Sequence, residues 1–350
     1  MIDRHAKAAA AILALVGLAA ADAPRVTGYV TGTWSKDFNY PASGTSSDYN
    51  YYEGKEASFQ LNAAHATLTG SDLGGANYVI DVDAGTDALK NPGSLSLGSG
   101  YAIDLQQAYV AVPFGKTPLA IQAGRFYTSE GIEVQNSGFN PTITRGLLFG
   151  QMECINHTGA ILTADFGKHL NLAAGAVNGW NNWTIPSADG LPMAYARIYA
   201  SAGDPLSATL SGYYGSAATL NGSRDDFLSL DLSGISRLTS TLDLNFQGNY
   251  QFRGAGSPDL DTKLYGAGIQ PLLHLDNAQL GFRYELFYKD LKGKEVTINS
   301  LSLAPGYRFA ASTLMRVEYR VDIGAEKDFQ ADGHKNRADQ VVTVELNHMF

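Results

Sequence analysis

The chain has 350 residues, which is long enough for two or three soluble domains or for one large barrel. Its 34 acidic residues outnumber its 25 basic ones and no run of lysines and arginines occurs, which argues against binding to the phosphate backbone of nucleic acids. The single cysteine, Cys154, excludes an internal disulfide, and the seven histidines lack metal-ligand spacing, so we expect no metal site and no cofactor.

The balance of residue types favours strands over helices. Charged residues make up only 17% of the chain and Met is scarce at 5, whereas Gly reaches 38, Tyr 19 and Phe 15. This composition suits many strands joined by hydrated turns. We therefore expect an all-β fold.

The N-terminus has the pattern of a secretory signal peptide. Arg4 and Lys7 precede an apolar run over residues 8–18, and three alanines follow at 19–21. The apolar run is too short to span a bilayer, and after Asp22 no stretch of about 18 apolar residues occurs. We expect a signal peptide over residues 1–21 and a mature chain over 22–350 that could enter a membrane only through strands.

Hydrophobic alternation with a period of two residues marks the mature chain. In residues 242–252, leucine and aromatic side chains occupy one face, and Asp, Asn and Gln occupy the other. Residues 277–290 and 314–323 repeat the pattern with full charges on the polar face. A β-sandwich also alternates in this way, so the pattern alone leaves a sandwich and a barrel open.

The number of alternating segments and the lengths of their connections favour a barrel. Short connections such as FGKT and GKH alternate with mostly long ones, of which residues 129–156 form the longest. This meander predicts a transmembrane antiparallel up-and-down β-barrel of 16 strands, with short turns on the periplasmic side. The predicted strands are 26–38, 58–68, 76–86, 101–113, 118–128, 157–166, 170–178, 193–203, 206–216, 226–238, 241–253, 261–273, 277–290, 298–309, 313–325 and 338–350.

One predicted strand fits the alternation poorly. Val296 and Ile298 lie in one phase, whereas Leu301 and the apolar residues after it lie in the other. Pro305 also lacks the N–H donor that an inner strand needs. A β-bulge near Ser300 would restore the phase, and we predict one there.

The last strand ends on Phe350, which the strand count places at the inner, periplasmic interface of the membrane, in the aromatic girdle. A terminal strand that pairs with the first strand leaves no free edge. Alternating apolar residues before a final Phe resemble the terminal signal of bacterial outer-membrane barrels, which implies that the assembly machinery reads Phe350 as a membrane assembly signal. His348 departs from that pattern, where Tyr or an aliphatic residue is usual.

Seven segments of residues 59–183 follow one another in the order of a known family: FQLNAAHATL (59–68), VIDVDAGTDA (79–88), IDLQQAYVAV (103–112), IQAGRFYTSEGIEV (121–134), NPTITRGLLFG (140–150), HTGAILT (157–163) and VNGWNNW (177–183). They resemble the putative beta-barrel porin-2 family, also called OmpL-like. The resemblance implies an outer-membrane porin and names no substrate. We expect a channel for passive diffusion of small hydrophilic solutes or ions in the lipid bilayer of a Gram-negative outer membrane, with a homo-oligomer as a possible state.

The connection 129–156 is the third outer loop by this strand count, the position at which general porins fold a long loop into the lumen. A loop of this length without elements of its own is uncommon unless it is functional. We expect it to narrow the lumen, and an external lid or an oligomer contact is the alternative. Its pore constriction candidates are Glu130, Glu133, Arg145 and Glu153.

A ladder of charged residues lies in the inward phase of two predicted strands. Opposite charges across a pore would create a transverse field, and mutual pairing of neighbouring charges is the alternative. Arg125 and Arg197 could belong to the same wall. The ladder residues are Arg283, Glu285, Arg316, Glu318, Arg320 and Asp322.

Two other functions stay open. An outer-membrane barrel enzyme of the lipase or protease type would need a catalytic cluster on the wall or rim, and no Gly-x-Ser-x-Gly motif occurs. A loop-mediated adhesin or receptor would bind a partner through the long connections. We expect the channel, and therefore no enzymatic activity.

Overall fold

The computed structural model describes residues 23–39, 49, 51–52, 57–185, 191–218, 224–254, 261–291, 294–326, 329–331 and 334–350. The expected signal peptide, residues 1–21, lies outside the described residues.

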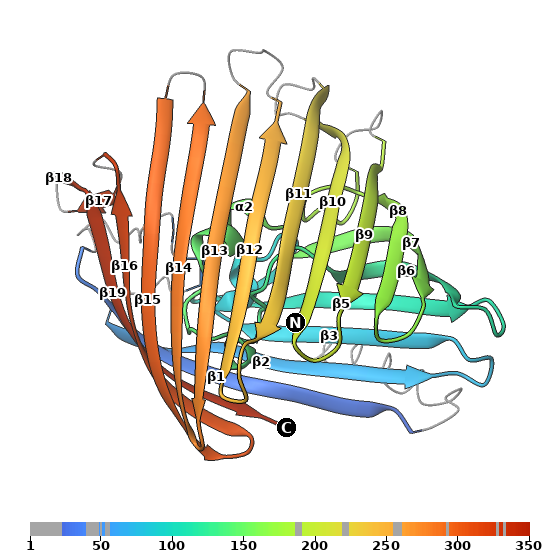
Figure 1. The fold of residues 1–350 in the computed structure, drawn as a ribbon, viewed down its shortest axis with the longest axis horizontal. Helices are drawn as coiled ribbons and strands as arrows, with labels where there is room; N and C mark the ends of the chain where they lie inside the picture. The colour runs from blue at the N-terminus through green and yellow to red at the C-terminus, as the bar shows by residue number, and fades with distance from the viewer. Residues whose placement is uncertain are drawn as a thin grey trace.

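Sixteen strands form one closed antiparallel barrel, so the predicted fold is confirmed (Figure 1). A further short strand, β4 (Leu95–Gly98), pairs with β5. The barrel strands are β1 (Arg25–Asp37), β2 (Ser58–Ser71), β3 (Asn77–Gly85), β5 (Tyr101–Pro113), β6 (Leu119–Tyr127), β7 (Asn156–Asp165), β8 (Leu170–Val177), β9 (Met193–Ser201), β10 (Leu206–Ala218), β11 (Arg224–Arg237), β12 (Leu242–Arg253), β13 (Thr262–Leu275), β14 (Ala278–Leu291), β15 (Lys294–Ala310), β16 (Thr313–Gly324) and β19 (Ala338–Met349).

The connections contain the remaining short elements. These are the 3-10 helices η1 (Asp87–Lys90) and η2 (Ser137–Phe139), the helix α2 (Leu147–Met152), and a hairpin of β17 (Phe329–Ala331) and β18 (His334–Asn336). Within the described part of the chain, no helix is long and apolar enough to cross a membrane.

The last strand closes the barrel on the first. β1 pairs with both β2 and β19, and the backbones of Gly28 and Phe350 exchange two hydrogen bonds of 2.9 Å. Residue 28 has to be glycine, because a Cβ there would lie 2.2 Å from the His65 carbonyl oxygen. The barrel wall therefore has no free strand edge.

Short turns gather at one end of the barrel, where β1 begins and β19 ends, and most longer connections lie at the other end (Figure 1). Only residues 292–293 separate β14 from β15, which is an exception at the long-loop end. In outer-membrane barrels the short turns face the periplasm.

Alternation places polar side chains inside the barrel and apolar ones outside. On β12, Asn245 and Gln247 are buried, and on β16 the inward Glu318 is fully buried. On the outer face, Val317 is 41% exposed and Tyr319 is 44% exposed. This is the arrangement of a wall with lipid outside and a polar interior.

The predicted bulge near Ser300 is wrong. β15 pairs with β14 without a register shift, and the irregularity in its pairing with β16 lies between Arg308 and Ala310. Ile298 and Ser300 both face inward and are buried. Ile298 is apolar because it packs in a cluster with Leu147 and other residues of α2, so the interior is locally apolar where the loop touches it.

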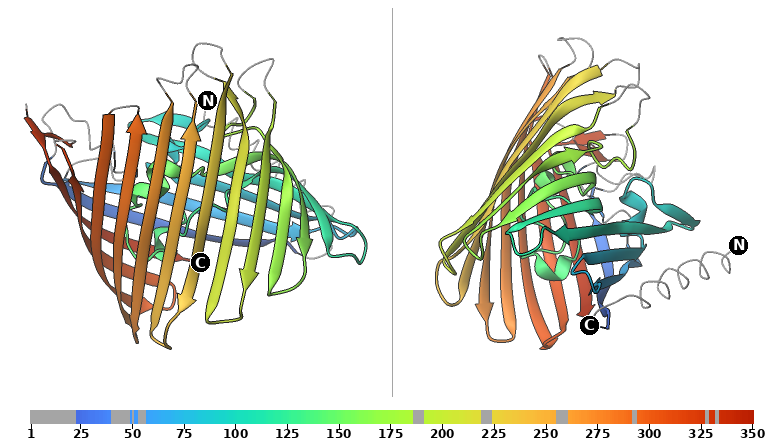
Figure 2. Two further views of the ribbon diagram at one scale, coloured as in Figure 1. Left: turned by 45° about the horizontal axis from the view of Figure 1, so that its top comes forward. Right: turned by 90° about the vertical axis from the view of Figure 1, so that its right-hand side faces the viewer.

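The strands differ in length around the wall. Strands β6 to β9 contain 8 to 10 residues, whereas β11 to β16 contain 12 to 17. The wall is therefore lower on the side of β6 to β9, which is coloured green in Figure 2.

Candidate functional site

The connection between β6 and β7, residues 128–155, passes through η2 and α2 and runs along the inner face of the barrel. Figure 2 shows α2 enclosed by the curved sheet. Hydrogen bonds join this segment to inward side chains of β11, β12, β13, β14, β16 and β19. We call residues 129–156, the connection as predicted from the sequence, the inner loop; its last residue, Asn156, is also the first residue of β7.

Arg283, on the inner face of β14, is the centre of the contact between the wall and the inner loop. Its guanidinium lies 2.9 Å from Glu133 of the loop, and 3.6 and 3.7 Å from Glu318 and Glu285 of the wall. It also donates to the Thr144 hydroxyl at 2.9 Å. The side chains of Arg283 and these three acids are at most 3% exposed, so the charges compensate one another away from solvent.

Arg316, on β16, holds the segment around η2. It donates to the carbonyl oxygens of Ser137 and Asn140, each at 2.7 Å, and to Glu345 of β19 at 2.7 Å. The hydroxyl of Ser137 donates to the same Glu345. This part of the loop is therefore fixed mainly through its backbone.

The remaining ladder residues of β16 contact the loop between η2 and α2. Glu318 accepts hydrogen bonds from the backbone N–H of Thr144 at 2.7 Å and from its hydroxyl at 2.7 Å. Arg320 donates to the carbonyl oxygen of Arg145 at 2.7 Å and pairs with Asp322 at 2.8 Å. The ladder arginines are thus paired with buried acids of the wall, and Arg283, Arg316 and Arg320 also bind the loop.

One carboxylate of the wall and one of the loop accept hydrogen bonds at the start of α2. Glu285 accepts from the backbone N–H of Leu147, and Glu133 accepts from that of Gly146, both at 2.6 Å. A Cβ on residue 146 would lie 2.2 Å from the Glu285 carboxylate, so only glycine allows this approach. On its other face α2 buries Leu148 against the inner wall.

Glu130 and Glu153 lie at the two ends of the inner loop, close to β11 and β12. Glu130 accepts from the Ser229 hydroxyl at 2.6 Å, and Glu153 accepts from the Gln247 amide at 2.5 Å. Burial, with a smaller effect from the nearby Asp231, raises the pKa of Glu130 to about 8 and that of Glu153 well above its usual range. Burial therefore favours the neutral form of both carboxyl groups.

Arg145 is separate from the other three constriction candidates. Its guanidinium donates to the carbonyl oxygens of Ile143, at 2.7 Å, and Gln135, and lies 4.9 Å from the centre of the Tyr52 ring. With Asp87 of η1 it borders a small void between the loop and the wall of β1 and β2. The structure thus brings Glu133 to the ladder, and Glu130 and Glu153 to β11 and β12.

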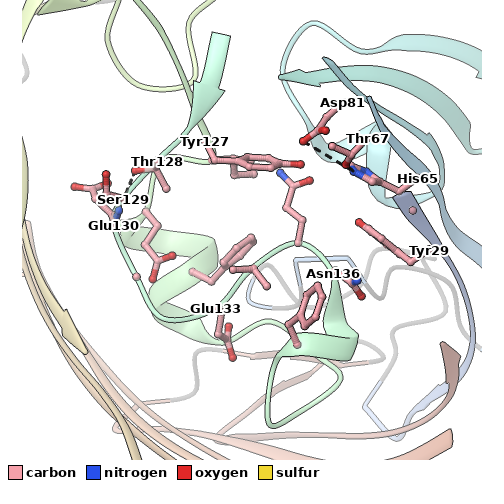
Figure 3. Close-up of a pocket in the computed structure, with 18 of the residues that line it drawn as sticks. Tyr29, His65, Thr67, Asp81, Tyr127, Thr128, Ser129, Glu130, Glu133 and Asn136 are labelled. Atoms are coloured by element: carbon pink, nitrogen blue, oxygen red, sulfur yellow. Dashed lines mark hydrogen bonds and ion pairs between the residues drawn. The ribbon is translucent and has the colours of Figure 1, made fainter. Parts of the chain in front are cut away.

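An open cavity of about 590 Å³ lies between the inner loop and the inner faces of β1 to β3 (Figure 3). Tyr29, His65 and Asp81 line it from the strands, opposite Glu130 and other loop residues. It extends to Phe350 at the short-turn end. None of the ladder residues lines it.

The residues that form the strand wall of this cavity were not predicted from the sequence. Tyr29, His65 and Asp81 were not among the candidates, although Asp81 and Asp83 share the inward phase of β3 and so gave a usable signal. Arg125 and Arg197 do not join the charged ladder. Arg125 stacks on Trp183 at 4.2 Å, and Arg197 donates to Asn171.

The inner loop occupies part of the polar interior of the barrel. The Arg283–Glu133 ion pair and hydrogen bonds from Arg316 hold it against the wall, and a cavity remains beside it. Among the described residues, no group of three or more His, Cys, Asp or Glu side chains is placed to hold a metal ion.

Comparison with protein families gives a match over most of the chain. The model of the family described as "Putative beta-barrel porin-2, OmpL-like" matches residues 24–350. The resemblance seen over residues 59–183 therefore extends through the second half of the barrel. A comparison with curated proteins gave no match.

Solved structures share the fold at low sequence identity. The chain is similar to an anion-selective porin from Comamonas acidovorans, with 16% identity, TM-score 0.65, and 94% of this chain and 99% of that chain covered. It is also similar to the outer membrane channel DcaP of Acinetobacter baumannii (12%, TM-score 0.64, 94% and 97%) and to a loop L8 deletion mutant of OmpT from Vibrio cholerae (11%, TM-score 0.64, 93% and 99%).

Proposed function

The chain belongs to the putative beta-barrel porin-2, OmpL-like family of outer-membrane proteins, and from this premise we propose that its inner loop sets the size and charge selectivity of the channel. Small hydrophilic solutes or ions would diffuse passively through the barrel. A barrel of 16 strands is too wide for wall side chains to fill, so an aqueous interior is expected.

The observation that carries the proposal is the attachment of the inner loop to one side of the barrel. Arg283 and Arg316 hold the loop against β14 and β16, and the cavity stays open on the side of β1 to β3. A solute crossing the barrel would pass this loop, where the passage is narrowest and charges are least screened.

Planar-bilayer recording on the purified protein tests the proposal. Replacing residues 134–150 by a short Gly-Ser linker should raise the single-channel conductance, because it removes η2 and most of α2 from the lumen. Unchanged conductance and ion selectivity in a correctly folded barrel would contradict the proposal and favour a role of the loop outside the passage.

Arg145 provides a test by substitution. Arg145→Glu reverses a buried charge on the loop and should shift ion selectivity towards cations. Arg237→Glu is the matched control, because the Arg237 side chain is 59% exposed at the short-turn end. Equal selectivity in the two variants would show that Arg145 does not act on permeating ions.

We propose no catalytic role for the barrel, since the matching family and the similar structures are channels. Hydrolysis of lipid or peptide by the purified protein would contradict this.

The proposal also includes the outer-membrane assembly machinery as a partner that reads Phe350.

A homo-oligomer is part of the proposal as well. One similar structure is a trimer form of OmpT from Vibrio cholerae, at 12% identity. The molar mass of the detergent-solubilised protein, measured by light scattering, tests this expectation. A monomer at all concentrations would contradict it.

A further inference from the structure

The cavity beside the inner loop has the properties of a binding site. Its volume of about 590 Å³ lies within the range of pockets that hold small organic molecules. Figure 3 shows Asp81, Thr67 and His65 on one side, and Ser129 and Glu130 on the other. The cavity therefore has two facing walls, one from the strands and one from the loop.

Asp81, at the edge of this space, carries a buried acceptor that has no partner among the described residues. The residue is 2% exposed and lines the cavity. Its Oδ2 atom accepts from the Gln107 amide at 2.5 Å and lies 4.0 Å from His65 Nε2, while Oδ1 has no hydrogen-bond partner among the described residues. A buried carboxylate oxygen without a partner is costly unless a ligand or water supplies a donor.

The neighbouring side chains fix this carboxylate in place. The His65 ring stacks on Tyr29, with the ring centres 4.7 Å apart and the planes at 16°. His65 Nε2 also lies 3.1 Å from the Thr67 hydroxyl. Asp81 therefore belongs to a preformed group at the edge of the cavity.

The charge of the lining is negative. Among the described residues, no Lys or Arg lines the cavity, and His65 is the only lining side chain that can become positive. Of the acids, Glu133 is paired with Arg283, and Glu130 and Glu153 make hydrogen bonds to the wall. Asp81 is the lining carboxylate that remains available to a cation.

Aromatic rings supply the rest of the surface. Tyr29, Tyr127, Phe139, Phe149 and Phe350 all line the cavity. Aromatic faces attract cations, and their apolar area suits a hydrocarbon body. A carboxylate beside several rings matches the two halves of an organic ammonium ion.

We propose that this cavity is a binding site for small organic cations with a primary ammonium group. The ammonium group pairs with the Asp81 carboxylate, which turns its unpaired oxygen towards the cavity, while the apolar part packs against Tyr29 and Tyr127. The site would lie on the short-turn side of the inner loop, next to Phe350. The inference rests on the proposed channel function, because it names a class of solute that would dwell in the passage.

Channel block by 2-phenylethylammonium chloride tests the site. Current carried by KCl through the purified full-length barrel should fall with increasing concentration of the amine added from the short-turn side. The neutral 2-phenylethanol, which has the same ring and chain, should block much less. This comparison uses only the wild-type protein, so it does not depend on the folding of any variant.

Two substitutions separate the contributions of charge and ring. Asp81→Asn should weaken the block about 10- to 100-fold, since a hydrogen bond to a charged group contributes about 1.5–3 kcal/mol. Tyr127→Leu should weaken it about 2- to 10-fold through the lost contact between aromatic rings, which is worth about 0.5–1.5 kcal/mol. The matched control is Asp276→Asn, which removes the same charge from an exposed turn with φ of 53°, a conformation that Asn tolerates.

The outcomes are distinguishable. A protein that carries no KCl current would overturn the proposed channel function itself. A conducting wild-type channel that the amine and the alcohol block equally, or an unchanged amine block in Asp81→Asn, would leave the channel intact and overturn the cation site.

Discussion

Replacing Arg283 by methionine should release the inner loop from the wall without unfolding the barrel. Methionine keeps part of the apolar stem but removes the charge that Glu133, Glu285 and Glu318 share. The strand pairing of β14 with β13 and β15 does not depend on that guanidinium. The effect should therefore fall mainly on the docking of the loop.

The size of the effect on loop docking follows from the burial of the Arg283 guanidinium. Removing one partner of a buried ion pair costs about 3–5 kcal/mol, because the other charge is left uncompensated. Since about 1.4 kcal/mol changes an equilibrium constant tenfold, docking of the loop should weaken by about 100- to 4,000-fold. A change of this size should populate undocked states that a single-channel trace can resolve.

The assay is single-channel recording with a parallel measurement of thermal unfolding. Arg283→Met should give a higher or fluctuating conductance, while the unfolding temperature of the barrel should change little. Arg237→Met is the control, because Arg237 is 59% exposed and its ion pair with Asp243 is worth at most about 1 kcal/mol. A folded Arg283→Met barrel with wild-type conductance and noise would refute the view that this cluster holds the loop.

Three further predictions concern the wall, the loop and the chain end. Phe246→Arg should destabilise the barrel in lipid by about 2–4 kcal/mol and Asn245→Arg much less, because only residue 246 faces lipid; equal urea midpoints would contradict the assignment. Burial raises the pKa of Glu130 to about 8, so deprotonation of its carboxyl group should weaken the attachment of the inner loop to the wall as pH rises from about 5 to 8. Conductance measured across this range should change, and a Glu130→Gln channel with the same pH profile would disprove this role of Glu130. Deleting Phe350 should lower membrane insertion in cells more than refolding in detergent; normal membrane levels of the truncated protein would count against an assembly signal.

The strands could be predicted because the membrane imposes one rule on every segment. Lipid outside and a polar interior force alternate residues such as Asn245 and Phe246 to opposite faces, and this rule holds for each strand separately. The rule fails at Ile298, because this inward side chain contacts α2 and not solvent. A local pattern cannot report a partner that arrives from elsewhere in the chain.

The site was harder to predict for the same reason. Glu133 and Arg283 are 150 residues apart and meet because of the path of the loop, which has no periodicity to read. The sequence indicated the charged residues but not which of them pair and which face open space. Asp81 could have been noticed from its inward phase, yet its unpaired oxygen depends on where the loop leaves a gap.

The unequal strand lengths have a consequence for the surrounding lipid. The eight residues of β8 rise about 26 Å along the strand and, at a tilt of about 40°, reach about 20 Å across the membrane, less than the usual apolar band of about 25 Å. The 14 residues of β14 reach about 35 Å by the same reasoning. The bilayer must become thinner beside β8, at a cost of fractions of a kcal/mol per Å of mismatch. That elastic strain is relieved when two thinned patches merge, so the membrane itself would draw the low sides of neighbouring barrels together.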